Sequence, residues 1–332
     1  GYTLTVKTDA GSTLTYEAKV GDLVFNQTPG NVGTYNVELS ADGLKNIANA
    51  LGTNYAYPQA AIDVKSHGTL NVNPSKVTVT LTGNTDGKTY DAKQTLASDL
   101  DLSKYSIGQV IVYSADGTKQ TVSLNAGDLQ IVGNATDVGS YDVKLSDAGK
   151  DRIKNLTGNN GDNYTWTFNS TAKYTISAAT AKANLDGFNE KVYDGTPVTT
   201  AQVNSNGQIL VHFTYPGSTE QSTYQLQDDD YTWNTGAAPT NVGTYTITLN
   251  KANILQHLQT EINKQAGVGQ DNKSNVTISA DDLSGQATFT IKAQPISNVV
   301  ISGNEQSKTY NGDAASLDVN GLTISADGTI SD

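Results

Sequence analysis

The feature that most constrains the fold is a short motif that occurs three times along the chain. Residues 31–35 read Asn-Val-Gly-Thr-Tyr, residues 137–141 read Asp-Val-Gly-Ser-Tyr, and residues 241–245 repeat the first version, at spacings of 106 and 104 residues. A period of this length is the size of a domain, so we expect an array of domains that each bury their own core, and not a solenoid.

A second series, Lys-x-Tyr-Asp or Lys-x-Tyr-Asn, begins at Lys88, Lys191 and Lys308 and alternates with the first. We interpret both series as structural repeat motifs. Their defining residues are Tyr90, Asp91, Tyr193, Asp194, Gly33, Tyr35, Gly139, Tyr141, Gly243 and Tyr245.

Aligning the copies predicts four segments. Repeat 1 spans 1–73 and lacks its opening strand, repeat 2 spans 74–178 and is complete, and repeat 3 spans 179–293 with a longer segment after its helix. Residues 294–332 form the opening strands of a partial repeat 4. These ends are explained by arbitrary boundaries of the fragment, or by strand exchange, in which this last segment of one copy fills the gap in the sheet of another.

Within each repeat, alternating Thr, Val, Ile and Tyr residues predict half-buried strands, and Gly-containing turns separate them. One short helix is expected after each Val-Gly-Thr-Tyr or Val-Gly-Ser-Tyr segment, with Ser40, Ser146 and Asn250 as N-caps. We therefore predict an α+β fold of tandem β-grasp-like domains. Each is a mixed, mostly antiparallel sheet with its first and last strands central and the helix packed across it. Short junctions, two of them with Pro, predict an extended rod.

Composition excludes several functions. The net charge of −12 disfavours nucleic acid, whose phosphates require clustered Lys and Arg. Cysteine is absent, which excludes thiol chemistry, and no apolar run is long enough to predict membrane insertion. We expect no cofactor.

The sequence predicts no enzyme, because the three histidines, His67, His212 and His257, fall at unrelated positions of their repeats. Asp228, Asp229 and Asp230 offer oxygen ligands for calcium, but an acidic turn is usually only solvated. The repeated Lys could form an amide cross-link to an Asn side chain. The favoured interpretation is that the Lys-x-Tyr-Asp segment builds a turn.

Tyr55, Tyr57, Tyr164 and Trp166 lie next to Asn-rich loops and are candidate contacts for a glycan, because sugars stack on exposed aromatic rings. The alternative is that these side chains pack across neighbouring strands.

Several elements together resemble a known family. They are the Tyr-Asp-Gly segment, then Gly21-Asp22 and Gly127-Asp128, the Asn-Val-Gly-Thr-Tyr motif with a helix behind it, and Asn54-Tyr55 and Asn163-Tyr164. This order is similar to the MBG domain, the β-grasp repeat of mucus-binding surface adhesins of Gram-positive bacteria. Repeat 3 departs from it, with Asp229-Asp230-Tyr231 in place of Gly-Asp and Asn275-Val276 in place of Asn-Tyr.

The resemblance implies a non-catalytic, extracellular, cell-wall-attached adhesin that binds mucin or other host glycoprotein glycans multivalently, with its export signal and wall anchor outside this stretch. The alternative is a stalk whose repeats present a distal binding domain.

Overall fold

The computed structural model describes residues 3–7, 11, 13–52, 68–114, 116–303, 305–317 and 319–327. The chain divides into two compact units. Unit 1 comprises Gly1–Asp86, Leu96–Val132 and Asp142–Lys173, and unit 2 comprises Gly87–Thr95, Gly133–Tyr141 and Tyr174–Asp332. The expected α+β fold is confirmed, with mixed and mostly antiparallel sheets and a helix after the Val-Gly-Thr-Tyr or Val-Gly-Ser-Tyr strand of each of the three repeats.

Repeat 1 belongs to unit 1. A hairpin of β1 (Thr3–Lys7) and β2 (Thr13–Glu17) precedes an antiparallel sheet in the order β3 (Leu23–Phe25), β4 (Gly33–Leu39), β5 (Gly68–Val72). The helix α1 (Ala41–Leu51) follows β4 and fully buries Ile47. Strand β5 lies at the edge of this sheet, and most of its residues are exposed.

Repeat 2 contains two sheets and one hairpin. In the first sheet, β6 (Ser75–Thr82) lies between β13 (Tyr164–Ser170), which is parallel to it, and β8 (Ser106–Ile107), which is antiparallel. The second sheet has the order β11 (Leu129–Ile131), β12 (Gly139–Leu145), β14 (Lys173–Ser177), β7 (Asp86–Thr89). The hairpin pairs β9 (Ile111–Tyr113) with β10 (Lys119–Thr121), and the helix is α2 (Asp147–Asn155).

Repeat 3, in unit 2, has one continuous six-stranded sheet. Its order is β18 (Ser222–Tyr224), β17 (Ile209–Thr214), β16 (Lys182–Val192), β22 (Leu283–Lys292), β20 (Gly243–Leu249), β19 (Tyr231–Trp233). The first and last strands, β16 and β22, are central and parallel, as the sequence predicts. A two-stranded pair of β15 (Ala179–Thr180) and β21 (Val276–Thr277) completes the strands of this repeat.

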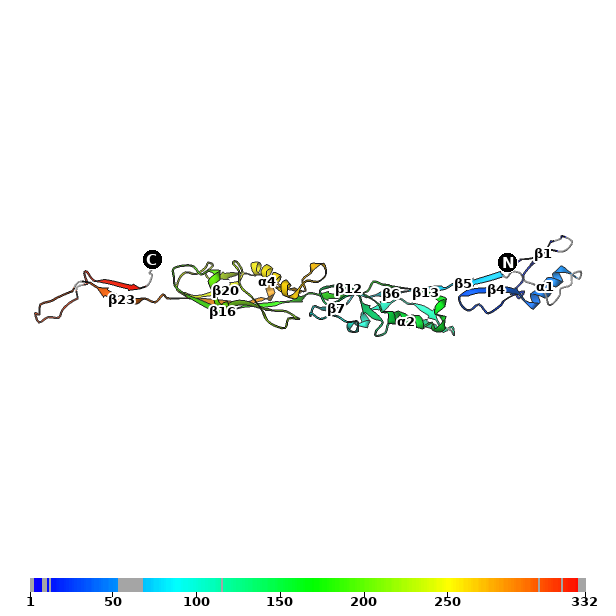
Figure 1. Ribbon diagram of the computed structural model, residues 1–332, viewed down its shortest axis with the longest axis horizontal. Helices are drawn as coiled ribbons and strands as arrows, with labels where there is room; N and C mark the ends of the chain where they lie inside the picture. The colour runs from blue at the N-terminus through cyan, green and yellow to red at the C-terminus, as the bar shows by residue number, and fades with distance from the viewer. Residues whose placement is uncertain are drawn as a thin grey trace. The chain divides into compact units, whose positions relative to one another are not determined.

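The helix α4 (Lys251–Ala266) lies against this sheet, as Figure 1 shows in yellow and orange. It fully buries the predicted residues Ile254, Leu258 and Ile262 at helical spacing. A further single-turn helix, α3 (Thr200–Val203), was not predicted. A capping box between Thr199 and Gln202 holds it.

The helix starts follow the predicted caps in two of three cases. The hydroxyl of Ser40 accepts a hydrogen bond from the Gly43 N–H at 2.9 Å, and Ser146 accepts one from Gly149 at 3.0 Å. Asn250 occupies the N-cap position of α4, but its side chain forms no capping hydrogen bond.

Residues 294–332 contribute the antiparallel pair β23 (Ser297–Ser302) and β24 (Thr323–Asp327). Every residue of the two strands is exposed. Strand exchange between copies stays a prediction.

Candidate functional site: a polar cleft and the repeated motifs

Unit 1 contains a cleft of about 630 Å³. Its lining residues are small, amide-bearing, hydroxyl-bearing or apolar, and none of them carries a charge. They are Gly30, Asn31, Val32, Val72, Asn73, Ser75, Tyr113, Ser114, Gly117, Asn160, Asn163 and Tyr164. In a protein with a net charge of −12, an uncharged cleft is a distinct local environment.

Two tyrosines meet at one wall of the cleft. Tyr164, the first residue of β13, follows a 3₁₀ helix at Gly158–Asn163. Its hydroxyl oxygen accepts a hydrogen bond from the main-chain N–H of Tyr113 at 2.9 Å. Tyr113, at the end of β9, is 52% exposed. Tyr164 was a candidate from its sequence, whereas Tyr113, 51 residues away in the chain, was not predicted.

The turn of this hairpin is held by Asp116. Its Oδ1 accepts hydrogen bonds from the Ser114 hydroxyl at 2.6 Å and the Thr118 N–H at 2.9 Å. These two bonds, with the Ser114 hydroxyl as the larger cause, lower the pKa of Asp116 to about 2. The carboxylate is therefore ionised at neutral pH and fixes the turn that carries Ser114 and Gly117 into the cleft wall.

Another part of the lining, Asn31 and Val32, belongs to the first copy of the Asn-Val-Gly-Thr-Tyr motif. The hydroxyl of Tyr35 donates to the carbonyl oxygen of Asn31 at 2.6 Å and accepts from the Asn31 N–H at 3.1 Å. Asn163 bonds to the same loop, because its Oδ1 accepts from the Val32 N–H at 2.6 Å. Main-chain and amide groups in this part of the lining are thus held in fixed directions.

Trp166, another of the candidate aromatic residues, is not among the residues that line the cleft. Trp166 is half-buried on β13, 5.9 Å from the Tyr164 ring and stacked at 5.9 Å on Phe168, between ring centroids. It is paired in register with Val77, which is buried. Tyr55 and Tyr57 lie outside the described residues.

A buried aspartate precedes the helix in every repeat: Asp22, Asp128 and Asp230 are 1%, 3% and 0% exposed. The main-chain carbonyl of each accepts a hydrogen bond from the N-cap N–H of the following helix. Their side chains were missed as structural anchors, although the recurrence of Asp before each helix was a signal in the sequence.

The side-chain partner of this aspartate on the helix differs between repeats. Asn46 donates to Asp22 at 2.7 Å, Arg152 donates to Asp128 at 2.9 Å, and His257 Nδ1 lies 2.7 Å from Asp230. The pKa of Asp22 is lowered, first by the Asn46 amide and then by the Lys19 N–H and the Tyr16 hydroxyl.

For Asp128, burial is the largest influence and acts to raise the pKa of the carboxyl. The Arg152 guanidinium and the Asn125 N–H together outweigh it, so the pKa is lowered. The charged form of this buried group is therefore stabilised by its partners.

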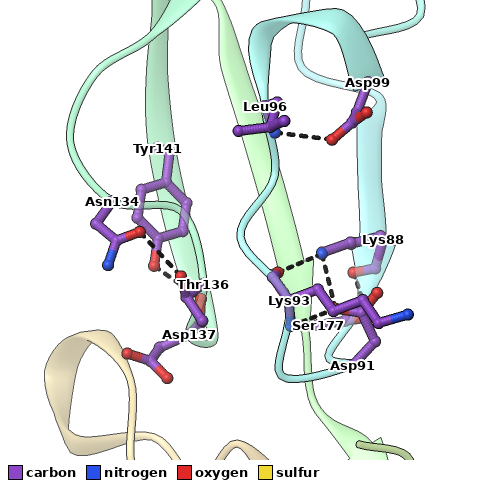
Figure 2. A network of polar contacts seen from close by, with 10 residues as sticks. All are labelled: Lys88, Asp91, Lys93, Leu96, Asp99, Asn134, Thr136, Asp137, Tyr141 and Ser177. Carbon is purple, nitrogen blue, oxygen red and sulfur yellow. Dashed lines mark hydrogen bonds and ion pairs between the residues drawn. The ribbon is translucent and has the colours of Figure 1, made fainter.

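The Lys-x-Tyr-Asp segments form turns. Figure 2 shows the Lys88 ammonium between Asp91 and the carbonyl of Lys93, to which it donates at 2.7 and 2.6 Å. Lys191 donates in the same way to Asp194 and the carbonyl of Thr196, at 2.9 and 2.7 Å. The Lys191 ammonium, followed by the Thr196 N–H and hydroxyl, lowers the pKa of Asp194 to about 2.

The tyrosines of these segments are less exposed than the carboxylates. Tyr90 is 6% exposed and its hydroxyl donates to the carbonyl of Ala266 at 3.2 Å. Tyr193 is half-buried. These contacts are those of a turn and its packing, which is the interpretation that the sequence favoured.

The acidic run 228–230 does not converge on a common point. The Asp230 carboxylate accepts from the Tyr224 hydroxyl at 2.6 Å and the Gln227 N–H at 2.7 Å. Within the part of the chain that the structure describes, no group of three or more His, Cys, Asp or Glu side chains is placed to hold a metal ion. No helix of that part is long and apolar enough to cross a membrane.

Comparison with known proteins gives likenesses to solved structures and a match to one family. The solved structure of a cell surface adhesin from Lactobacillus reuteri is 24% identical and covers 35% of this chain and 99% of its own, with a TM-score of 0.22. No curated protein sequence matches the chain. The model of the MBG domain matches residues 1–74, 76–178 and 180–293, which together make up most of the chain. The chain therefore belongs to the MBG domain family, of which it carries three copies in tandem.

Proposed function

We propose that the chain is a non-catalytic repeat region of a bacterial cell-surface adhesin, and that the cleft of unit 1 binds an uncharged sugar of a host glycoprotein such as a mucin. Membership of the MBG domain family supports the adhesin assignment. It also supports an extracellular location on the cell wall.

The single observation that carries the sugar proposal is the chemistry of the cleft. Its lining combines asparagine amides, serine hydroxyls and two tyrosines without a charged side chain, in a volume of about 630 Å³. Pockets of roughly 300–1,000 Å³ accommodate small ligands, and amides and hydroxyls pair with sugar hydroxyls as both donors and acceptors. The exposed ring of Tyr113 offers an apolar face for stacking.

The test is binding of the full chain to a glycan array and to purified mucin, measured beside variants of the cleft. Tyr113→Ala removes the exposed ring, and we expect a loss of affinity of about fivefold to tenfold, equivalent to the ~1–1.4 kcal/mol of one ring contact. Tyr164→Phe removes the hydroxyl that holds Tyr113 and should weaken binding less. Tyr310→Ala is the matched control, because Tyr310 is 92% exposed and does not line the cleft.

Equal binding by all three variants and the parent chain would reject the cleft as the binding site. Absence of any glycan or mucin binding by the parent would favour a second function, that of a stalk. One observation supports this alternative: at the second copy of the motif, the Gln270 N–H donates to the carbonyl of Val138, the counterpart of the cleft residue Val32, so repeat 3 occupies this loop.

A further inference from the structure

One side-chain contact occurs twice, between residues far apart in the chain. Asn163 Oδ1 accepts a hydrogen bond from the Val32 N–H at 2.6 Å, while its Nδ2 donates to Asn31 Oδ1 at 2.8 Å. Asn275 Oδ1 accepts from the Val138 N–H at 2.8 Å, and its Nδ2 donates to Asp137 Oδ1 at 2.8 Å.

Each contact joins two successive MBG copies and lies inside one compact unit, the first in unit 1 and the second in unit 2. In both, the asparagine directly precedes a strand, β13 or β21, and the loop that it contacts directly precedes β4 or β12. The two asparagines therefore occupy equivalent positions in their repeats, although one is followed by Tyr and the other by Val.

The receiving loop has the same internal support in all three copies. The hydroxyls of Tyr35, Tyr141 and Tyr245 donate to the carbonyl oxygen four residues earlier, at 2.6, 2.8 and 2.7 Å. The third loop forms this tyrosine–carbonyl bond although, among the described residues, no asparagine side chain bonds to its Val242 N–H. A loop that is held before its partner arrives loses less conformational entropy when the partner binds.

The valine of the loop is less exposed where an asparagine contacts the loop. Val138 is 6% exposed and Val242, its counterpart in the third loop, is 54% exposed. Asn275 itself is 1% exposed. A buried amide side chain needs partners for both its oxygen and its nitrogen, and the loop supplies both.

The second contact is the more extensive. The Gln270 N–H donates to the carbonyl of Val138 at 2.7 Å, so both main-chain groups of Val138 are paired by repeat 3. The two segments also approach closely at Gly269, where an added Cβ would lie 2.0 Å from the Val138 carbonyl oxygen.

We propose that the Asn/Asp-Val-Gly loop of each repeat is a docking site for the asparagine that precedes a strand in the following repeat. The two occupied copies hold successive repeats together. The third loop, at residues 241–243, is the same site in its open form, and the partner that fits it is a further MBG repeat with an asparagine at this position. The repeated motif is thus an interaction surface between repeats, independent of whether any cleft binds a sugar.

Amide hydrogen exchange of the full chain, followed residue by residue by NMR, tests this directly. We expect slow exchange of the Val32 and Val138 amides and fast exchange of the Val242 amide. Asn163→Ala should accelerate exchange at Val32 and Asn275→Ala at Val138, each by about tenfold or more, which corresponds to ~1.4 kcal/mol. Asn241→Ala, at the open loop, is the matched control and should change neither.

Two further variants keep the test valid if Asn275→Ala disturbs its own repeat. Gly269→Ala places a methyl group against the Val138 backbone and should also accelerate exchange at Val138. Gly108→Ala is its control, because an added Cβ there meets nothing within 4 Å.

Exchanging the amide and the carboxylate between residues 137 and 275 distinguishes a specific pairing from general packing. Asn275→Asp places a carboxylate against that of Asp137, and like charges repel. The double variant Asp137→Asn with Asn275→Asp restores a donor and an acceptor, so Val138 should exchange more slowly in the double variant than in Asn275→Asp alone. Equal exchange in the two would contradict the proposed pairing.

The open site is tested by a chain in which residues 294–332 are replaced by a second copy of residues 179–293. Protection of the Val242 amide should rise to the level of Val138, and Asn→Ala at position 275 of the added copy should remove it. A Val242 amide that stays unprotected in the lengthened chain, or a Val138 amide unaffected by both Asn275→Ala and Gly269→Ala, would overturn the proposal.

Discussion

At the scale of single residues, the buried aspartates show how one structural task is met by different chemistry. Asp22, Asp128 and Asp230 each join the segment before the helix to the helix itself, through an amide, a guanidinium and an imidazole in turn. A buried carboxylate requires partners because transfer of the charge from water is costly. The partner type is free to vary as long as it donates a hydrogen bond.

The cost of losing one partner can be measured at Arg152, the single arginine of the chain. Arg152→Ala leaves Asp128 buried without its cation. We expect a loss of about 2–3 kcal/mol in the stability of repeat 2, at the lower end for a broken buried pair because the arginine side chain is 29% exposed. Calorimetry, with hydrogen exchange of the β13 amides to assign the transition, provides the measurement.

The control for this change lies on the same helix. Lys150 pairs with Asp147 at 2.9 Å, but the aspartate side chain is 92% exposed. Lys150→Ala should cost less than about 1 kcal/mol, because exposed pairs contribute little. Similar losses for the two variants would show that burial of Asp128 is not the cause.

Acid should destabilise the protein by protonating aspartates that accept hydrogen bonds in the folded state. Asp116, Asp194 and Asp282 have pKa values lowered to about 2 from a reference of 3.8, and the pKa of Asp22 and Asp128 is also lowered. A group whose pKa is lower in the folded state stabilises that state above the unfolded pKa, and loses this effect as pH falls toward the folded value. The melting temperature should therefore hold to about pH 4 and fall from there toward pH 2.

Asp194→Asn offers a check on this pH dependence. Asparagine retains an acceptor oxygen for the Thr196 N–H but does not titrate, so the melting temperature of this variant should fall less steeply between pH 4 and pH 2. An identical slope in the variant would mean that other groups control the acid transition.

At the scale of elements, the first turns of α1 and α2 lie very close to the main chain of the segment that precedes each helix. In α1 and α2, the third helical residue is a glycine, and an added Cβ would lie 2.1 Å from the Asp22 carbonyl oxygen at Gly43 and 2.5 Å from that of Asp128 at Gly149. Repeat 3 has Asn253 at this position, whose side chain instead donates to the carbonyl of Asp229 at 3.2 Å. The distance between the helix and the preceding segment therefore sets the residue size at this position.

Gly149→Ala tests this constraint, because we expect it to lower the stability of the protein where a Gly→Ala change in a helix ordinarily raises it. In an open helix the change would stabilise by about 1 kcal/mol through propensity. Here the clash with Asp128 must displace the helix, so we expect repeat 2 to be less stable. Thermal denaturation should show this as a lower melting temperature. Gly161→Ala is the comparison, because its nearest atom to an added Cβ is at 3.9 Å. A more stable Gly149→Ala variant would show that the helix can move away without cost.

At the scale of the whole molecule, the net charge of −12 and the uncharged cleft predict different responses to pH for different glycans. As pH falls toward the isoelectric point of about 4.6, repulsion of anionic sugars decreases. We expect binding to a sialylated glycan to strengthen roughly threefold from pH 7.5 to pH 5 at low ionic strength, and the change to shrink in high salt.

A neutral glycan of the same backbone is the control for this prediction, and its affinity should stay constant between these pH values. Titration calorimetry on the two glycans measures both. Stronger binding of the neutral glycan at low pH would point to a titrating group inside the cleft, contrary to its lining.

Much of the fold followed from the sequence, because the signals were local. Three signals each depend on residues close together in the chain: the alternation in the strands, the serine caps at Ser40 and Ser146, and the buried stripe of α4. Two features were not predicted. The helix α3 is a single turn, too short to show a helical period, and repeat 2 has a three-stranded and a four-stranded sheet where repeat 3 has one six-stranded sheet beside the β15–β21 pair.

The cleft was only partly predictable. Tyr164 was a candidate because of its position beside the Asn-rich loop, whereas Tyr113 lies 51 residues away and reaches it through a hairpin. Trp166 was grouped with Tyr164 by its neighbourhood in sequence, but residues two apart on β13 extend along the strand, so only the first borders the cleft.

The sequence by itself determined the repeat period, the α+β class and the helix starts, since these depend on interactions between near neighbours in the chain. Only the tertiary structure decided which asparagine contacts which loop. Those contacts join residues 131 to 138 positions apart, and a local pattern carries no information on which loops meet when separate copies pack. The motif that identified the repeats is therefore also the surface through which two of them are joined to the next.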